Sequence, residues 1–221
     1  MYSYHKLDIY GYQQEPVPHT FFRQSNGSSH VGIIFSGQNI TCQHPTLYYP
    51  TRELLLREAD TLLVDYALRP AFSTFSGEQI KACVEADTIA AYQALFRERT
   101  YQQVTLIGKS LGTLAMVYLL LTVPQIPQVR AIWLTPLLKR PEFRAAVQRV
   151  HPRSLFIIGT ADPHYDAGEL KELENVTQGE TLVIEGADHL LEVPGGIIPS
   201  LHVMEQIMQT IQNFCESMRK D

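Results

Sequence analysis

The chain has 221 residues and a formal net charge of −5, and 45% of its residues are hydrophobic and 19% charged. This length and mixture are typical of one globular domain, residues 1–221, with one sizeable core. Lysine and arginine are dispersed without a basic stripe, which argues against a nucleic-acid partner, and an acidic membrane surface would repel the chain slightly. The longest apolar stretch, residues 114–123, is too short to span a bilayer.

The three cysteines are Cys42, Cys83 and Cys215. They are odd in number, widely spaced and form no CxxC pair, so they predict neither a disulfide framework nor a zinc site. We expect three reduced, buried thiols. No signal peptide pattern is visible at the first residues. Together these features predict a cytoplasmic protein, either a monomer or a homodimer.

The first elements along the chain are two possible short strands, residues 7–14 and 20–24, joined through Pro16 and Pro18. After them the pattern becomes regular, with short apolar runs that alternate with longer segments of helical spacing. The runs expected to form strands are 31–35, 61–66, 104–107, 131–134, 154–158 and 181–184. The segments expected to form helices are 49–59, 77–99, 111–121, 141–150, 167–175 and 201–218.

Strands that alternate with helices pair in parallel through right-handed crossovers. Nearly continuous apolar strands agree with this, because a parallel sheet is covered on both faces. The predicted fold class is therefore α/β, with a mostly parallel twisted sheet of about eight strands and helices on both faces. An antiparallel pair comes first and six parallel strands follow. Binding sites in such sheets lie at the carboxyl ends of the strands.

One strand, 104–107, runs directly into Gly108-Lys109-Ser110-Leu111-Gly112, and a helix follows. This is a G-x-S-x-G motif in a strand–turn–helix setting, in which small neighbours allow a sharp turn that raises the serine above the sheet. The helix dipole and the backbone N–H of Leu111 can then stabilise negative charge beside Ser110. We expect the Lys109 side chain to be solvated beside the turn.

The spacing of the glycines argues against two other interpretations of these segments. A phosphate-binding P-loop requires glycine at position 103, where the chain has Gln103. A dinucleotide-binding fold requires GxGxxG after the first parallel strand, where the chain has Phe35-Ser36-Gly37-Gln38-Asn39.

A nucleophilic serine requires a base, and His189 follows the last strand of the series. A carboxylate must orient that base, and Asp162 follows the preceding strand. Asp166 is the fallback acid, although a helix N-cap is its better interpretation. A second oxyanion N–H is expected from the loop after strand 31–35, with Gln38 as the first choice by position and Gly37 or Asn39 as alternatives.

At this point the sequence resembles the α/β-hydrolase superfamily over nearly its whole length. The likeness is carried by GIIFSGQN (32–39), LLVDY (62–66), LIGKSLGT (106–113), LFIIGTADPHYD (155–166) and IEGADHLLEV (184–193). It is greatest to small, lid-less members such as dienelactone-hydrolase-like enzymes and orphan serine hydrolases. The resemblance implies a catalytic triad of Ser110, Asp162 and His189 in that order.

The resemblance also implies that the oxyanion hole uses backbone N–H groups of Leu111 and Gln38. One departure is Ser36-Gly37, where many members have His-Gly; backbone donors tolerate this change. Lid insertions usually follow strand 131–134, and here only residues 135–140 separate that strand from the next helix. We therefore expect a shallow pocket. The residues expected to line it are Gly37, Asn39, Ile40, Leu137, Leu138, Pro163 and Leu190.

These features predict a serine hydrolase that cleaves small carboxylic esters or thioesters through an acyl-enzyme on Ser110. No organic cofactor is expected, and no HExxH or clustered His/Asp pattern calls for a metal. The alternative is a catalytically idle α/β-hydrolase scaffold that acts as a binding module.

Overall fold

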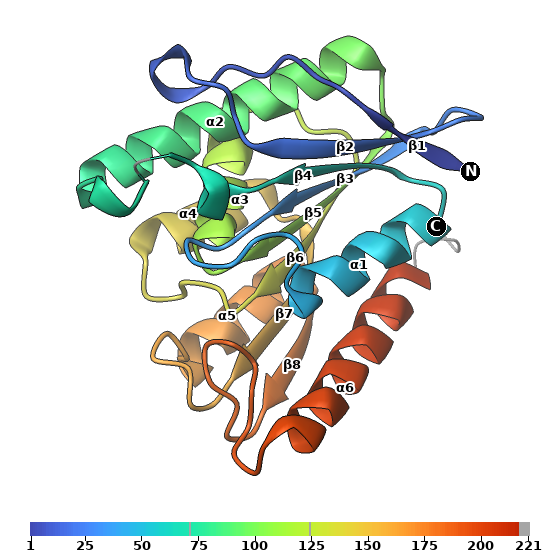
Figure 1. The fold of residues 1–221 in the computed structure, drawn as a ribbon. Helices are drawn as coiled ribbons and strands as arrows, with labels where there is room; N and C mark the ends of the chain where they lie inside the picture. Colours follow the sequence, from blue (N-terminus) through green and yellow to red (C-terminus); the bar gives the residue numbers. More distant parts are fainter. Residues whose placement is uncertain (71, 124, 217–221) are drawn as a thin grey trace.

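The computed structural model describes residues 1–70, 72–123 and 125–216. Within these residues eight strands form one sheet in the order β1-β2-β4-β3-β5-β6-β7-β8 (Figure 1). The strands are β1 Tyr2–His5, β2 His19–Gln24, β3 His30–Phe35, β4 Asp60–Val64, β5 Gln103–Lys109, β6 Val129–Leu134, β7 Arg153–Gly159 and β8 Glu180–Ile184. The α-helices are α1 Pro45–Leu56, α2 Gly77–Glu98, α3 Leu111–Thr122, α4 Pro141–Val150, α5 Ala167–Thr177 and α6 Ile197–Glu216.

The pairing of the strands confirms the predicted fold class. Strands β3 to β8 are parallel to their neighbours, whereas β2 pairs antiparallel with both β1 and β4. The central strands β3 to β7 are almost wholly buried because helices cover both of their faces. All six parallel strands therefore end at one edge of the sheet.

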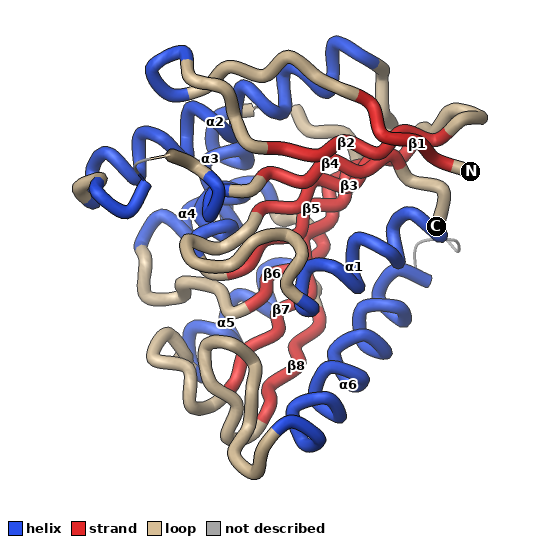
Figure 2. Tube along the Cα trace, in the orientation of Figure 1, coloured by secondary structure: helices blue, strands red, loops and turns tan. Residues whose placement is uncertain are grey.

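Two hydrophobic clusters form the core, and helices lie on both faces of the sheet (Figure 2). Helices α2, α3, α4 and α5 contribute to the larger cluster, and α1 and α6 contribute to the smaller one. Helix α3 is buried along nearly its whole length, since it packs between the sheet and its neighbours α2 and α4. This position holds the N-terminus of α3 rigidly at the carboxyl edge of the sheet.

The prediction of a strand at residues 7–14 is wrong. The first strand is β1, and residues 7–14 form an irregular segment that ends in the 3₁₀-helix η1, Tyr12–Gln14. Leu7 and Ile9 are buried as expected of a strand, but their neighbours turn. Gly11 lies so close to Asp87 that a Cβ would meet its Oδ1 at 2.0 Å. The apolar pattern of residues 7–14 therefore reflects burial in the core, and this segment does not form a strand of the sheet.

Helix boundaries shift where proline or loop packing decides them. The helix predicted at 49–59 begins earlier, at Pro45, because proline at the first position suits a helix start and Pro50 is tolerated inside α1. The helix predicted at 201–218 begins at Ile197; positions 217 and 218 lie outside the described residues. The helix 141–150 is confirmed with the bounds of α4, and α2 begins with a capping box between Ser76 and Gln79.

Among the described helices, none is long and apolar enough to cross a membrane.

Candidate active site

Ser110 occupies a sharp turn between β5 and α3. Its backbone has φ 53° and ψ −114°, a conformation that non-glycine residues adopt only under constraint. The turn depends on two glycines. A Cβ on Gly108 would lie 2.5 Å from the Gly112 oxygen, and a Cβ on Gly112 would lie 2.2 Å from the Phe35 oxygen. The sharp turn at Ser110 therefore requires glycine at positions 108 and 112.

The structure brings Ser110, His189 and Asp162 together in one hydrogen-bonded chain. Ser110 Oγ lies 2.8 Å from His189 Nε2, and His189 Nδ1 lies 2.7 Å from Asp162 Oδ2. A carboxylate partner favours the tautomer that carries the proton on Nδ1, which leaves Nε2 to accept the serine hydroxyl. These three residues come from separate loops at the carboxyl edge of the sheet, as predicted.

Backbone contacts between the loops after β7 and β8 hold His189 beside Asp162. The Ala161 N–H donates to the Ala187 oxygen at 3.0 Å, and the Gly186 N–H donates to Thr160 Oγ1 at 2.8 Å. Asp188 closes the next turn by accepting the N–H groups of Leu190 and Glu192. The imidazole is therefore carried on a loop with its own internal bonds.

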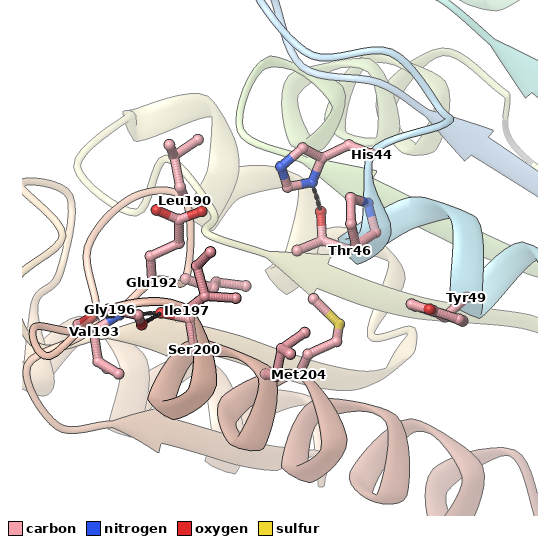
Figure 3. Close-up of a pocket in the computed structure, with 13 residues that line it drawn as sticks. His44, Thr46, Tyr49, Leu190, Glu192, Val193, Gly196, Ile197, Ser200 and Met204 are labelled. Carbon is pink, nitrogen blue, oxygen red and sulfur yellow. Dashed lines mark hydrogen bonds between the residues drawn. The ribbon is translucent and has the colours of Figure 1, made fainter.

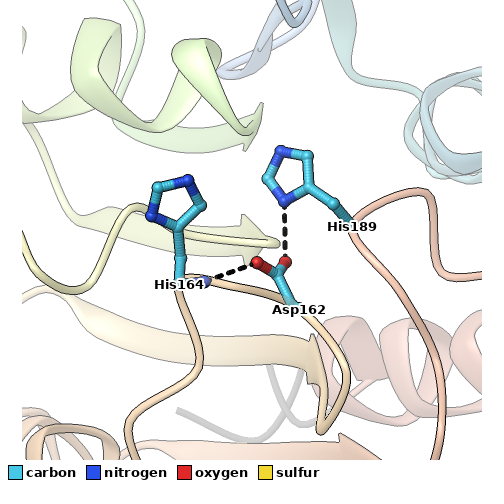
Figure 4. Close-up of side chains that lie close together, drawn as sticks. All are labelled: Asp162, His164 and His189. Atoms are coloured by element: carbon cyan, nitrogen blue, oxygen red, sulfur yellow. Dashed lines mark hydrogen bonds and ion pairs between the residues drawn. The ribbon is translucent and has the colours of Figure 1, made fainter.

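The Asp162 carboxylate is fully buried and accepts two hydrogen bonds. His189 Nδ1 donates to Oδ2, and the His164 N–H donates to Oδ1 at 2.8 Å (Figure 4). Burial by itself raises the pKa of Asp162, but these hydrogen bonds outweigh it and hold that pKa below its usual range. The carboxylate is therefore ionised at neutral pH and can stabilise an imidazolium at His189.

The expectation that Lys109 is solvated is wrong. Its side chain is 1% exposed, and its ammonium donates to Thr135 Oγ1 at 3.0 Å and to the His189 carbonyl at 2.7 Å. Burial lowers the pKa of Lys109 to about 8, although nearby Asp162 and Asp188 act in the opposite direction. Lys109 thus ties the end of β6 and the His189 loop to the strand that carries Ser110.

The two residues expected to form an oxyanion hole both lie near Ser110. Leu111 is the first residue of α3, so its N–H has no acceptor one turn earlier in the helix. Gln38 lies in the loop after β3 and lines the same cavity as Ser110. Ser36, where related sequences were expected to have His, is buried; its hydroxyl accepts the Tyr66 N–H and donates to the Gly37 oxygen. The loop geometry is thereby held without a histidine.

A cavity of about 480 Å³ opens beside Ser110, a volume typical of small-molecule sites. Its lining comes from the first two turns of α3, the N-terminal part of α2 and the start of α4. Of the residues expected to line a pocket, Leu137 does so, and Gln38, which was expected as an oxyanion donor, lines the cavity too. The residues that line it are Gln38, Gly77, Glu78, Ile80, Lys81, Val84, Ser110, Leu111, Leu114, Tyr118, Leu137, Arg140, Glu142 and His164.

The other expected pocket residues lie elsewhere. Leu190 lines a second groove of about 380 Å³ between the first turns of α1 and α6, where His44 Nδ1 lies 2.9 Å from Thr46 Oγ1 (Figure 3). Five residues are not among those that line the Ser110 cavity, although their sequence neighbours Gln38, Leu137 and His164 line it. They are Gly37, Asn39, Ile40, Leu138 and Pro163. Leu138 and Ile40 pack into the two core clusters.

The fallback acid Asp166 is a helix cap. Its carboxylate accepts the Glu169 N–H at 2.9 Å at the start of α5. The three cysteines are free and buried, as expected.

Sequence reasoning finds no clustered metal ligands, but Asp162, His164 and His189 offer ligand atoms within 4.8 Å of one another. A metal there would displace the hydrogen bond between His189 Nδ1 and Asp162 Oδ2. His164 also lies on the cavity wall, with its ring centroid 5.5 Å from that of His189. Burial lowers the pKa of His164, so its imidazole is neutral at physiological pH.

The sequence did not predict that residues of α2 and α4 line the cavity. One signal for the α3 wall is visible in the sequence: Leu111, Leu114 and Tyr118 follow Ser110 at the spacing of one helix face. No such signal links the α2 residues to Ser110, since only tertiary packing brings α2 beside α3.

No family model and no curated protein matches the sequence, but solved structures match it over nearly its whole length. A ferulic-acid-bound Est1E from Butyrivibrio proteoclasticus is 13% identical, covers 96% of this chain and 99% of its own, and has a TM-score of 0.70. A dienelactone hydrolase from Anabaena variabilis is 16% identical, with coverage of 94% and 96% and a TM-score of 0.66. An α/β serine hydrolase without a lid from Xanthomonas campestris is 14% identical, with coverage of 96% and 92% and a TM-score of 0.66.

Proposed function

We propose that this chain, which has the α/β-hydrolase fold, is a serine hydrolase that cleaves small carboxylic esters or thioesters. The observation that carries the proposal is the chain of hydrogen bonds from Ser110 through His189 to Asp162, which ends beside a cavity of about 480 Å³. The esterase and hydrolase activities named for its structural neighbours support the same chemistry.

In the first half of the reaction, His189 Nε2 takes the hydroxyl proton as Ser110 Oγ bonds to the substrate carbonyl carbon. The N–H groups of Leu111 and Gln38 donate to the oxyanion of the tetrahedral intermediate. The bond to the leaving group then breaks, and the proton on His189 passes to the departing alcohol or thiol. An acyl group remains on Ser110.

In the second half, His189 takes a proton from water as the water oxygen bonds to the acyl carbon. The bond to Ser110 Oγ breaks, the proton returns to that oxygen, and a carboxylic acid leaves. Asp162 stays ionised throughout and stabilises the imidazolium at each step. Lys109 is a positioning residue, because its contact is with the His189 carbonyl.

The first test is hydrolysis of p-nitrophenyl acyl esters from acetate to palmitate by the wild type and Ser110→Ala. The expected result is turnover by the wild type that vanishes in the variant while the circular dichroism spectrum is unchanged. A fluorophosphonate probe should label Ser110 in the wild type alone. Equal rates in both folded proteins, with no labelling, would favour an idle scaffold that acts as a binding module.

A further inference from the structure

The Ser110 cavity has an apolar wall near the nucleophile and a polar far end. Leu111 and Leu114 lie on the α3 face next to Ser110, and Val84 faces them from α2. Further along the same α3 face comes Tyr118, with Glu142 from the first turn of α4 beside it. An acyl group that enters from Ser110 would therefore meet hydrocarbon first and hydrogen-bonding groups last.

The polar end contains groups without partners. Glu142 Oε2 is buried and accepts no hydrogen bond within the described residues. For Tyr118, the described residues provide a cation–π contact, with Lys81 Nζ 5.9 Å from the ring centroid, and no hydrogen bond to the hydroxyl. An unpaired buried acceptor costs stability, and a ligand that donates a hydrogen bond to it removes that cost. Neither Glu142 Oε2 nor the Tyr118 hydroxyl has a hydrogen-bond partner within the described residues, so a ligand can supply one.

Charge at this end favours neither a cationic nor an anionic ligand. Lys81 and Arg140 line the cavity along with Glu78 and Glu142, so cations and anions are equal in number there. A charged ligand would lose part of its hydration without a net opposite charge to offset that cost. A hydroxyl is neutral and both donates and accepts, so it can donate to Glu142 and accept from Tyr118.

The position of Tyr118 on α3 limits the length of the acyl group that fits between Ser110 and Tyr118. Tyr118 lies eight positions after Ser110 in the sequence, which is roughly 12 Å along a helix axis. Its side chain leans back toward the start of α3, so the span left for an acyl group is roughly 8 to 10 Å. A linear chain of about eight carbons with a terminal hydroxyl has that length.

We propose that Glu142 and Tyr118 select acyl groups of this length that end in a hydroxyl, so that the enzyme prefers ω-hydroxyacyl esters to isosteric apolar ones. This inference rests on the proposed hydrolase function, and it names the acyl class that the Ser110 site accepts. A site built to bind a hydroxyl leaves its own polar groups unpaired when the substrate lacks one, and so rejects that substrate.

The test compares kcat/KM for methyl ω-hydroxyoctanoate and methyl nonanoate, in which a methyl group replaces the hydroxyl. We expect a preference of about tenfold to a hundredfold for the hydroxy ester in the wild type. The ratio should fall toward one in Glu142→Leu and in Tyr118→Phe, which remove the acceptor and the donor. The matched control is Glu172→Leu, at an exposed carboxylate on α5 outside the cavity, which should keep the wild-type ratio.

Three outcomes overturn the inference while the hydrolase function stands. They are Ser110-dependent hydrolysis with a ratio of one or below, a ratio that survives both cavity variants, and a greater preference for the ω-amino or ω-carboxy analogue. Fluorophosphonate labelling of Ser110 without hydrolysis of any of these esters also overturns it. If the probe fails to label folded wild-type protein, the proposed function itself is lost.

Discussion

Two buried aspartates lie at opposite edges of the sheet and have different roles. The side chains of Asp60 and Asp162 are both fully buried, and each accepts hydrogen bonds from more than one donor. Asp60 begins β4 and accepts from the Gln24 N–H, from Arg99 and from the Tyr101 hydroxyl at 2.7 to 2.8 Å. Asp162 follows β7 and accepts from the His189 imidazole.

The difference lies in the donors. Arg99 forms an ion pair with Asp60, and burial raises the pKa of the Tyr101 phenol. Asp60 therefore joins β2, β4 and the segment before β5 through one ion pair and two further hydrogen bonds. The donor to Asp162, in contrast, is the imidazole of His189, which is hydrogen-bonded to Ser110 on the wall of a cavity. Burial and hydrogen bonding are common to both aspartates, and only Asp162 is linked to a residue that lines this cavity.

The largest expected effect comes from Asp162→Asn. The amide favours the wrong imidazole tautomer, so kcat for p-nitrophenyl acetate should fall about 10⁴-fold while the protein stays folded. The matched control is Asp166→Asn, which changes the helix cap of α5 and should leave kcat near the wild-type value. A fall of less than tenfold in Asp162→Asn would show that Asp162 is not the orienting acid.

The same substitution at the other edge of the sheet should affect stability instead. Asp60→Asn leaves Arg99 without its ion pair, and because that side chain is partly exposed we expect a loss of about 2 to 3 kcal/mol in the free energy of unfolding. Urea denaturation measures the loss, and kcat of the folded fraction should not change. If kcat falls as much as in Asp162→Asn, the two edges do not have separate roles.

A smaller effect is expected from the buried cation near Asp162. Lys109→Met removes the donor to the His189 carbonyl and leaves the loop less well held, so kcat should fall about tenfold with a smaller change in KM. The amount of fluorophosphonate adduct should reach the wild-type level more slowly. If kcat of this variant equals that of the wild type, Lys109 contributes to packing and does not position His189.

The smallest expected effect is a dependence of stability on pH. The pKa of Asp162 is lower in the folded protein than in the unfolded chain, so its ionised form adds stability at pH above about 4, the unfolded value. That contribution is lost as the pH falls through the folded pKa. The difference in unfolding free energy between the wild type and Asp162→Asn should shrink as the pH falls below about 4. A difference that grows below pH 4 contradicts this sign.

Much of this arrangement follows from local sequence. Apolar runs bounded by glycine and polar residues predict the six parallel strands, and the order of Ser110, Asp162 and His189 after three of them predicts a shared edge, because parallel strands end together. The sharp turn at Ser110 is equally local, since glycine is the only residue type that fits the close contacts at positions 108 and 112. These inferences depend on backbone geometry within a few residues.

Tertiary structure alone decided the rest, because the determining contacts join segments far apart in the chain. Residues 7–14 have the apolar pattern of a strand, but packing of Gly11 against Asp87 keeps them outside the sheet. Lys109 has the position of a surface residue, but the carbonyl that accepts its hydrogen bond lies 80 positions away at His189. The walls of the Ser110 cavity come from α2, α3 and α4, and no local pattern encodes which faces of three helices meet.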